Sequence, residues 1–375
     1  MNVLDTLTGD AQTFIEKVWA REVCLHDASP EFAQSLLSLA DADHLLTQTA
    51  IRTPAVRLAQ NGTVLPERSY TRTGASIAGS ALSGLVDPRR LLDLYDAGAT
   101  VVLQGLHRSW PALTALTADL EEALGHPVQV NAYLTPPGAQ GFAVHADTHD
   151  VFVVQTHGSK LWEVHRGEGV EEVLMVPGRC LYLPTGTRHA ARAQEGVSLH
   201  VTVGINQLTL RGLVERTIRA AVAEVPATHL PAGYAEDPGA LVETLGQVLL
   251  DLGERIARLD PAAAVAAEVA RLFSTRPTRA GGGLLDRTAL AALDDSTCLT
   301  RRTTTPAVLE PAGDRLHLLL GDRVLEVPAR LQAALELVIA RNTLTPADLA
   351  GLLDESSRLV LCRRLVREGL LQVAR

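Results

Sequence analysis

Three residues of the sequence have the types and the spacing of a metal-binding site. His145 and Asp147 form a His-x-Asp pair, and His189 follows Asp147 by 42 residues. Two histidines and one carboxylate are the ligand set of non-haem Fe(II) centres that keep positions open for substrate and oxygen. We therefore predict that His145, Asp147 and His189 are metal ligands and catalytic residues.

The expected secondary structure would bring these three side chains together. His145 and Asp147 lie in a strand-like run, and residues i and i+2 of a strand project from the same face. A Pro184-x-Gly186 turn precedes His189 and would direct it from a neighbouring strand into the mouth of a barrel.

His149 is the alternative ligand, because it has the same strand parity as His145 and Asp147. It could equally be a residue at the end of the strand. We favour His145, because residues 142–144 lead into it as a buried strand. His157 stands beside a glycine in an expected hairpin turn, and we expect it to be exposed.

Lys160 calls for an explanation, because it and Lys17 are the only lysines among 34 Lys and Arg residues. On a strand it shares a face with Trp162 and Val164, which indicates that this face points inward. A buried lysine needs an anionic partner. A small dicarboxylate that chelates the metal with its other end would supply one, and Tyr133 could donate a phenolic hydrogen bond to the same carboxylate. The alternatives are an exposed lysine at a strand end and an ordinary core tyrosine.

The pattern of elements predicts a β-core preceded by helices. Helical spacing is seen at 10–22, 31–47, 88–97 and 111–125. Short strands separated by Gly and Pro turns suggest a sandwich or barrel. These strands are expected at Val101–Leu103, Val128–Leu134, Phe142–His145, Val151–Thr156, Leu161–His165, Glu172–Met175, Cys180–Leu183 and Ser198–Gly204.

The pattern changes after residue 206. Apolar helices are expected at 208–224 and 239–274, and part of their surface is expected to pack against another subunit. Residues 275–284 read as a linker, from their Pro and Gly content. The tail then predicts strands at 307–310, 315–320, 323–327 and 370–373, and helices at 329–340, 345–352 and 357–367. That order resembles a winged-helix unit.

Composition narrows the function classes. The net charge is −9, which argues against non-specific nucleic-acid binding through a basic surface. Residues 300–375 hold eleven Arg, no Lys and nine acidic residues, so the tail is also expected to bind phosphates weakly. Four scattered cysteines predict no disulfide framework. We see neither a signal peptide nor a membrane span, and expect a cytoplasmic protein.

The stretch from Asn131 to Trp162, NAYLTPPGAQGFAVHADTHDVFVVQTHGSKLW, resembles the JmjC-type ribosomal oxygenases, also called the cupin-4 family. The resemblance is close over about 95–205. It implies a double-stranded β-helix, the cupin/JmjC barrel, of mixed β and α content with flanking helices. It also implies three parts: a catalytic domain at 1–206, a helical dimerisation region and linker at 207–284, and a winged-helix-like domain at 285–375.

The resemblance also implies roles for single residues. His145, Asp147 and His189 match the family's iron ligands, Lys160 the residue that pairs with the distal carboxylate of 2-oxoglutarate, and Tyr133 the tyrosine that hydrogen-bonds it. Thr202 is near a position that often contacts this co-substrate. Asn131 and Gln155 are candidates to line the pocket. The residues after Asp147 depart from the family's commonest forms, which puts the substrate in doubt.

The implied protein is a homodimeric Fe(II)- and 2-oxoglutarate-dependent dioxygenase that uses O2 to hydroxylate a side chain of a protein, with an Arg or His of a ribosomal protein as the first expectation. The alternative is the same chemistry on a peptide or a natural-product intermediate. A third hypothesis is a non-enzymatic cupin scaffold or a cupin that uses another metal. The complete ligand set together with Lys160 argues against the third.

Overall fold

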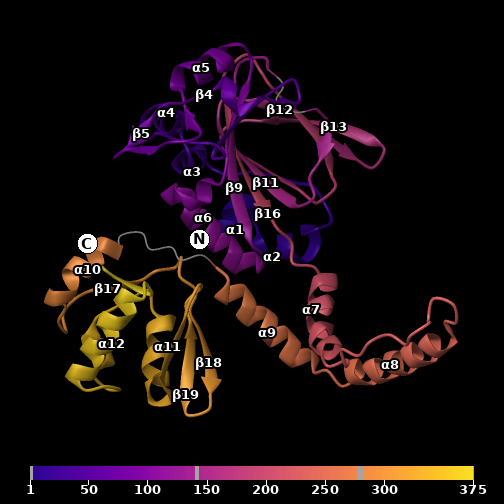
Figure 1. Ribbon diagram of the computed structural model, residues 1–375. Helices are drawn as coiled ribbons and strands as arrows, with labels where there is room; N and C mark the ends of the chain where they lie inside the picture. Colours follow the sequence, from indigo (N-terminus) through magenta and orange to yellow (C-terminus); the bar gives the residue numbers. More distant parts are fainter. Residues whose placement is uncertain (1–2, 140–142, 277–282, 375) are drawn as a thin grey trace. The chain divides into compact units, whose positions relative to one another are not determined.

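The computed structural model describes residues 3–139, 143–276 and 283–374. The chain forms two compact units, Met1–Gln207 and Leu208–Arg375 (Figure 1). Two sequence expectations fall partly outside the described residues: the start of the strand Phe142–His145 and most of the linker 275–284.

The first unit contains short helices followed by a β-rich region. Its helices are α1 (Val3–Thr8), α2 (Ala11–Thr13), η1 (Phe14–Val18), α3 (Pro30–Leu36), α4 (Leu39–Gln48), η2 (Glu67–Ser69), α5 (Pro88–Asp96), η3 (Leu106–Arg108) and α6 (Pro111–Leu124). The strands of the central sheets are β1 (Cys24–Asp27), β2 (Val56–Gln60), β3 (Thr63–Val64), β8 (Thr100–Leu103), β9 (Val128–Thr135), β10 (His145–Ala146), β11 (Asp150–His157), β12 (Lys160–Arg166), β13 (Gly169–Met175), β14 (Arg179–Leu183), β15 (Arg188–Ala193) and β16 (Ser198–Ile205).

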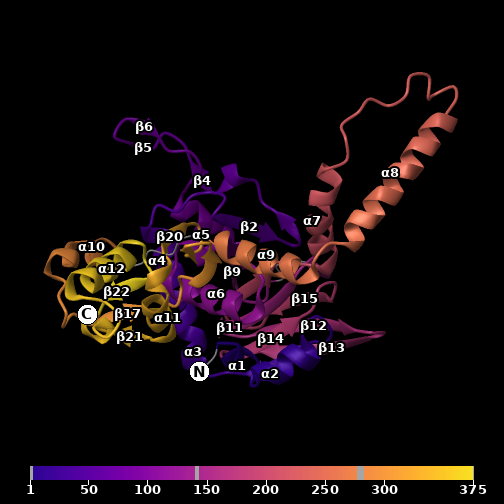
Figure 2. The same cartoon turned by 90° about the horizontal axis from the view of Figure 1, so that it is seen from below.

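These strands form two sheets. The large sheet has eight strands in the order β1-β14-β11-β16-β9-β8-β2-β3, and the small sheet has four in the order β10-β15-β12-β13. All their pairings are antiparallel. Two hairpins lie outside these sheets, one of β4 (Thr71–Arg72) with β7 (Leu85–Val86) and one of β5 (Ser76–Ile77) with β6 (Ser80–Ala81). The β5–β6 hairpin projects from the first unit (Figure 2).

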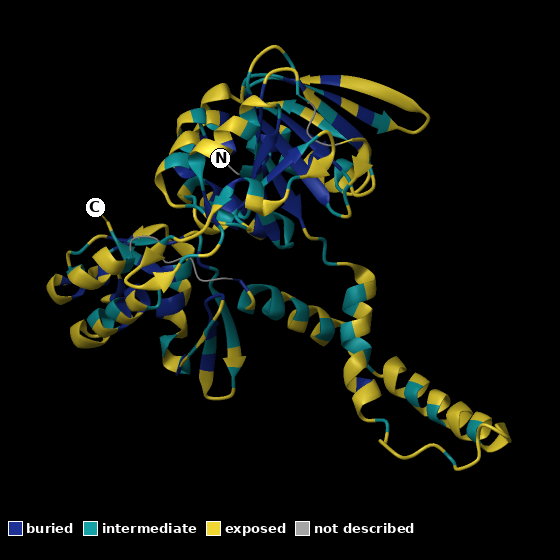
Figure 3. Ribbon diagram, turned by 45° about the horizontal axis from the view of Figure 1, so that its top comes forward, coloured by how far each residue is buried: buried dark blue, intermediate teal, exposed yellow. Residues whose placement is uncertain are grey.

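Successive side chains of each strand point to opposite faces of the large sheet, so its two faces pack against different layers. On one face of the large sheet, Val130, Phe152 and Val201 join a core with the residues that the helices bury, such as Leu113 and Leu120 of α6. On the other face, Val151, Val153 and Leu181 pack against Trp162 and Val164 of the small sheet. Figure 3 shows the buried residues concentrated between these layers.

The structure has the mixed β and α content that was expected and corrects the details of the fold. Among the described residues the strands form two facing sheets and not one closed barrel. The predicted helix 10–22 ends at Val18. The predicted helix 31–47 is two helices, because Leu37 is extended and Ser38 caps α4. His189 was expected on a neighbouring strand, but the bounds of that strand, β15, were not among the predicted ranges.

The second unit begins with α7 (Leu210–Ala223), α8 (Gly239–Ala257) and α9 (Pro261–Ser274). The predicted helix 239–274 is therefore interrupted, because Asp260 caps α9 and Pro261 starts it. No helix in the described part of the chain is long and apolar enough to cross a membrane.

The rest of the second unit has its own core. Its elements are α10 (Gly283–Ala289), η4 (Leu290–Ala292), β17 (Leu299–Arg301), β18 (Val308–Ala312), β19 (Arg315–Leu319), β20 (Val324–Pro328), η5 (Ala329–Leu331), α11 (Gln332–Ala340), β21 (Thr343–Leu344), η6 (Pro346–Leu349), α12 (Glu355–Arg367) and β22 (Leu371–Val373). The order agrees with the strands and helices expected for the tail, although 345–352 forms only the short η6. The strands make two three-stranded sheets, β18-β19-β20 and β21-β17-β22.

Candidate metal centre

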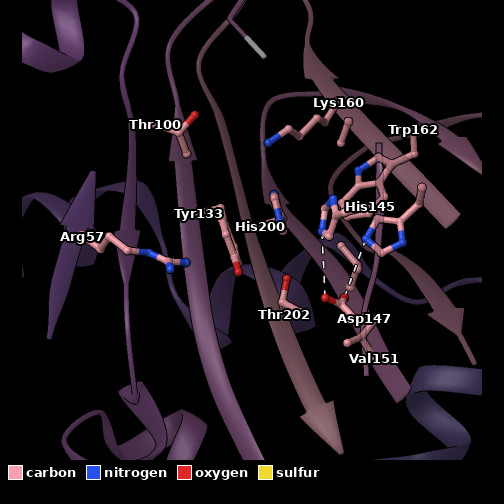
Figure 4. A pocket seen from close by; sticks show the side chains of 13 residues that line it. Arg57, Thr100, Tyr133, His145, Asp147, Val151, Lys160, Trp162, His200 and Thr202 are labelled. Carbon is pink, nitrogen blue, oxygen red and sulfur yellow. Dashed lines mark ion pairs between the residues drawn. The ribbon is translucent and has the colours of Figure 1, made fainter. Parts of the chain in front are cut away.

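The structure brings His145, Asp147 and His189 together at one edge of the small sheet. His145 on β10 is the direct cross-strand partner of His189 on β15, and Asp147 follows β10. The His145 Nε2 atom lies 3.9 Å from Asp147 Oδ1, and the His189 Nε2 atom lies 3.7 Å from Asp147 Oδ2 (Figure 4). One ligand atom from each residue lies within 4.8 Å of the other two.

Both histidines are oriented by backbone carbonyls. The Nδ1 atom of His145 is 2.9 Å from the Ala143 carbonyl oxygen, and that of His189 is 2.9 Å from the Thr187 carbonyl oxygen. Donation from Nδ1–H to a carbonyl leaves the Nε2 lone pair directed at Asp147, as in metal-binding histidines. Burial lowers the pKa of His189 and the neighbouring His145 lowers it further, whereas the Thr187 backbone and Asp147 act in the opposite direction.

The donor set fits a divalent metal ion. Two imidazole nitrogens and one carboxylate meet on one side of a pocket, and no fourth His, Cys, Asp or Glu of the described residues joins this group. This arrangement is that of a facial Fe(II) site. Trp162 lies against the His189 ring, with centroids 5.6 Å apart and planes at 27°, and therefore shields one ligand from solvent.

His149 does not compete for the metal position. A Cβ atom on Gly204 would lie 2.5 Å from His149 Nε2, so the imidazole packs against the backbone of β16. The glycine at 204 permits this close approach. The expectation that a buried strand leads into His145 is nevertheless wrong. The strand β10 has only two residues, both exposed, and Val144 before it is 42% exposed.

Asp150 anchors the turn that carries His189. Its carboxylate is 1% exposed and accepts hydrogen bonds from the Tyr182 hydroxyl, from the backbone N–H and hydroxyl of Thr185, and from the Gln207 side-chain amide. Gly186 of the same turn donates its N–H to the Asp147 carbonyl oxygen at 3.0 Å. The Asp150 carboxylate thus holds the turn that precedes His189 in sequence and that is hydrogen-bonded to Asp147.

Replacing Asp150 with asparagine is expected to weaken the metal site without removing a ligand. All four of these hydrogen bonds are donated to the carboxylate, so an amide NH2 would face another donor, at a cost of about 1–3 kcal/mol of stability. We expect a lower melting temperature and Mn(II) affinity reduced about tenfold. Asp43→Asn, at an exposed position of α4, is the control. Unchanged metal affinity in Asp150→Asn would contradict the positioning role.

A pocket of about 240 Å³ opens beside the three candidate ligands, between the two sheets (Figure 4). It is lined by Arg57, Thr100, Tyr133, His145, Asp147, Val151, Val153, Lys160, Trp162, His189, Ala191, His200 and Thr202. Asp147 is the only carboxylate among these lining residues. The volume is slightly below that of typical small-molecule sites, about 300–1,000 Å³, and suits a compact ligand.

Lys160 lies inside this pocket, 3% exposed, at the start of β12. Its ammonium donates to Thr135 Oγ1 at 2.9 Å, and burial lowers its pKa to about 7. Trp162 and Val164 are buried on the same face, as predicted. The turn before Lys160 requires glycine, because a Cβ atom at Gly158 would lie 1.8 Å from the Val197 carbonyl oxygen.

The other candidate residues fall into two groups. Tyr133 and Thr202 line the pocket. Asn131 and Gln155 do not belong to the lining: the Asn131 side chain accepts from the Gly105 N–H at 3.0 Å, and Gln155 donates to Ser198 Oγ at 2.9 Å. Both are structural side chains here.

Sequence reasoning missed three polar residues of the pocket: Arg57, Thr100 and His200. For His200, the i, i+2 relation to Thr202 on a strand was the available signal. Arg57 and Thr100 lie on β2 and β8, far from the motif in sequence, and no local pattern points to them.

Comparison with known proteins agrees with this description. Two facing sheets with a His-Asp-His cluster define a cupin-type protein. Residues 110–168 and 165–213 match the model of a family described as JmjC domain. Residues 110–213 are therefore similar to a JmjC domain, in agreement with the resemblance inferred from Asn131–Trp162.

The relatives carry two names, ribosomal oxygenase and bifunctional lysine-specific demethylase and histidyl-hydroxylase. Human Ribosomal oxygenase 1 is 30% identical over 239 residues, which cover 56% of this chain and 36% of the human protein. A protein of Branchiostoma floridae named bifunctional lysine-specific demethylase and histidyl-hydroxylase NO66 is 38% identical over 141 residues, 37% of this chain and 23% of that protein. The chain spans about a third of the length of the first curated relatives it matches.

The fold extends beyond the JmjC domain. A solved structure of YcfD, a ribosomal oxygenase from Escherichia coli, in complex with cobalt and 2-oxoglutarate, aligns with 98% of both chains at a TM-score of 0.53. The two sequences are 16% identical, so this likeness shows a shared fold.

Proposed function

We propose that this protein is an Fe(II)- and 2-oxoglutarate-dependent oxygenase that hydroxylates a side chain of a protein substrate. The observation that carries the proposal is one pocket in which a His-Asp-His ligand set and a buried lysine face the same space. Relatives named ribosomal oxygenase and histidyl-hydroxylase support it, as does the YcfD structure with cobalt and 2-oxoglutarate.

His145, Asp147 and His189 would hold the metal ion through two imidazole Nε2 atoms and one carboxylate. With 2-oxoglutarate and O2, bound Fe(II) supplies the oxidising power that converts a C–H bond to C–OH while the co-substrate is cleaved to succinate and carbon dioxide. Lys160 would bind the distal carboxylate of 2-oxoglutarate, because an ammonium in this buried position needs an anion.

The remaining walls protect and orient the reactants. Val151, Val153, Trp162 and Ala191 present apolar groups to the pocket and exclude water from it. Tyr133 and Thr202 offer hydroxyl groups for the co-substrate or the target side chain. Burial raises the pKa of Tyr133, so its hydroxyl keeps its proton and remains a donor.

Succinate release tests the activity, and mass spectrometry tests the substrate class. The protein with Fe(II) and 2-oxoglutarate is expected to form succinate faster when its substrate is present. Intact-mass analysis of ribosomal proteins should then show a gain of one oxygen atom, at an Arg or His by the first expectation. Oxygen gain only in a peptide or natural-product intermediate would favour the alternative substrate class. Failure to form succinate with any of them would contradict the proposal.

We also propose that the helical part of the second unit, within 207–284, mediates homodimer formation. The 19-residue helix α8 buries none of its residues (Figure 3). Its sequence nevertheless carries an apolar stripe. Val242, Leu245 and Leu249 of that stripe are 67%, 51% and 56% exposed. An exposed apolar stripe at this spacing is typical of helices that pack against another helix.

Introducing charge into this stripe is expected to produce monomers. The variant Leu245→Glu/Leu249→Glu should halve the mass measured by light scattering, because glutamates in an apolar helix contact are costly to desolvate. Gln247→Glu is the matched control, since residue 247 lies on the opposite side of α8 and is exposed. A wild-type protein that is already monomeric would contradict the dimer.

The tail, within 285–375, is proposed as a winged-helix-like module without strong affinity for nucleic acid. The order of its elements supports the first part. The second is supported by ion pairs such as Arg315–Glu326, Arg341–Asp348 and Arg364–Glu368, which occupy guanidinium groups that a phosphate backbone would need. A cytoplasmic site of action would be consistent with a ribosomal substrate.

A further inference from the structure

One buried, titratable side chain in the pocket has no role in the site as described so far. His200 lies at the centre of the large sheet on β16, with Tyr133 of β9 and Gln155 of β11 as its cross-strand partners. It is 3% exposed, and it lines the same pocket as Lys160 (Figure 4).

The His200 ring is held by stacking. It lies parallel to the Tyr133 ring, with centroids 4.9 Å apart and planes at 6°, and it meets Trp162 edge-on at 5.5 Å and 77°. Its Nδ1 atom is buried and has no hydrogen-bond partner among the described residues. The tautomer of a histidine is set by the hydrogen bond that one of its nitrogens makes. The protein therefore leaves the ring free to present an N–H to a ligand.

The charged groups that act on His200 differ from those that act on Tyr133. Lys160 is the charge that acts on His200, and together with burial it keeps the pKa of His200 well below its ordinary value. The charges that act on the Tyr133 hydroxyl are instead Arg57 and Asp147. Beside Lys160 this chain thus has the His200 imidazole in addition to the Thr135 hydroxyl.

We propose that His200 is a co-substrate-binding residue, which donates its ring N–H to the distal carboxylate of 2-oxoglutarate while Lys160 binds the other oxygen of that carboxylate. This rests on the proposed function. A neutral imidazole beside an ammonium is suited to a carboxylate, because it adds a hydrogen bond without a second positive charge. It also gives the buried ring the polar partner that it lacks in the described chain.

The inference predicts a penalty that depends on the distal carboxylate of the ligand. His200→Phe keeps the aromatic stack and removes both ring nitrogens. Titration calorimetry on the Mn(II)-loaded protein, without turnover, should show 2-oxoglutarate binding weakened by about tenfold or more. Binding of 2-oxobutanoate, which chelates the metal but has no distal carboxylate, should change less than about twofold, because the lost hydrogen bond is one it never made.

Two further variants make the result decisive. His200→Asn retains an N–H donor and should recover part of the affinity for 2-oxoglutarate. His157→Phe, at an exposed position at the end of β11, controls for the loss of a histidine. Equal weakening of both ligands, or none, in a His200→Phe protein that binds Mn(II) normally would overturn the assignment of His200. A wild-type protein that binds Mn(II) but neither ligand would contradict the proposed function itself.

Discussion

Replacing Asp147 with alanine is expected to abolish succinate formation. Asp147 is the only carboxylate among the three candidate ligands, and both histidine Nε2 atoms lie within 3.9 Å of it. Its loss leaves two imidazole donors without an anionic ligand, which hold a divalent ion poorly. Removal of groups that merely orient metal ligands costs about 10–100-fold in affinity, so loss of a ligand should cost at least about a hundredfold.

This expectation is checked by Mn(II) titration together with the succinate assay. Asp43→Ala, at an exposed position of α4, is the matched control and should behave as the wild type. Succinate formation by Asp147→Ala at the wild-type rate would show that the metal site lies elsewhere.

Replacing Lys160 with alanine is expected to remove the affinity for 2-oxoglutarate while sparing the metal. Truncating one partner of a buried, hydrogen-bonded charge pair costs about 2–5 kcal/mol, which corresponds to at least about a thirtyfold rise in the KM for 2-oxoglutarate. Mn(II) affinity should change little, because the Lys160 ammonium donates to Thr135 and is not one of the three candidate ligands. Lys17→Ala, the only other lysine, is an exposed control. An unchanged KM would exclude Lys160 from co-substrate binding.

The affinity for 2-oxoglutarate is also expected to fall at alkaline pH. Burial lowers the pKa of Lys160 to about 7 when no anion is bound, so above that pH the free site is increasingly neutral. Binding requires the cation, and the dissociation constant should therefore rise by up to about tenfold per pH unit above about 7 and level off below it. Calorimetry on the Mn(II)-loaded protein between pH 6 and pH 9 measures this. The slope should vanish in Lys160→Ala, and a pH-independent wild-type affinity would contradict the role of the ammonium.

Residue types and spacing were enough to predict which three side chains meet, because His145 and Asp147 are near in sequence and a Pro-Gly turn precedes His189. The strand pairing that brings them together could not be predicted. The strand β15 has the sequence RHAARA, whose alanines and arginines carry little strand signal, and it is a strand because it pairs with β10 and β12. The direct pairing of His145 with His189 follows from that register.

The residues that surround and support the three candidate ligands could not be predicted for a similar reason. Asp150 and His200 stand in ordinary-looking strand segments, and their importance depends on partners far away in the chain. Asp150 meets Thr185 and Gln207, and His200 faces Tyr133 across the sheet. Lys160 could be singled out, because a lysine in a chain that otherwise uses arginine is conspicuous even without its partners.

A crystal structure of the protein grown with Mn(II) and 2-oxoglutarate tests the central claim most directly. We predict one metal ion bound by His145 Nε2, Asp147 carboxylate oxygen and His189 Nε2, with the co-substrate chelating the ion and its distal carboxylate on Lys160. A metal ion bound by other residues, or 2-oxoglutarate bound away from Lys160, would contradict the assignment of this pocket.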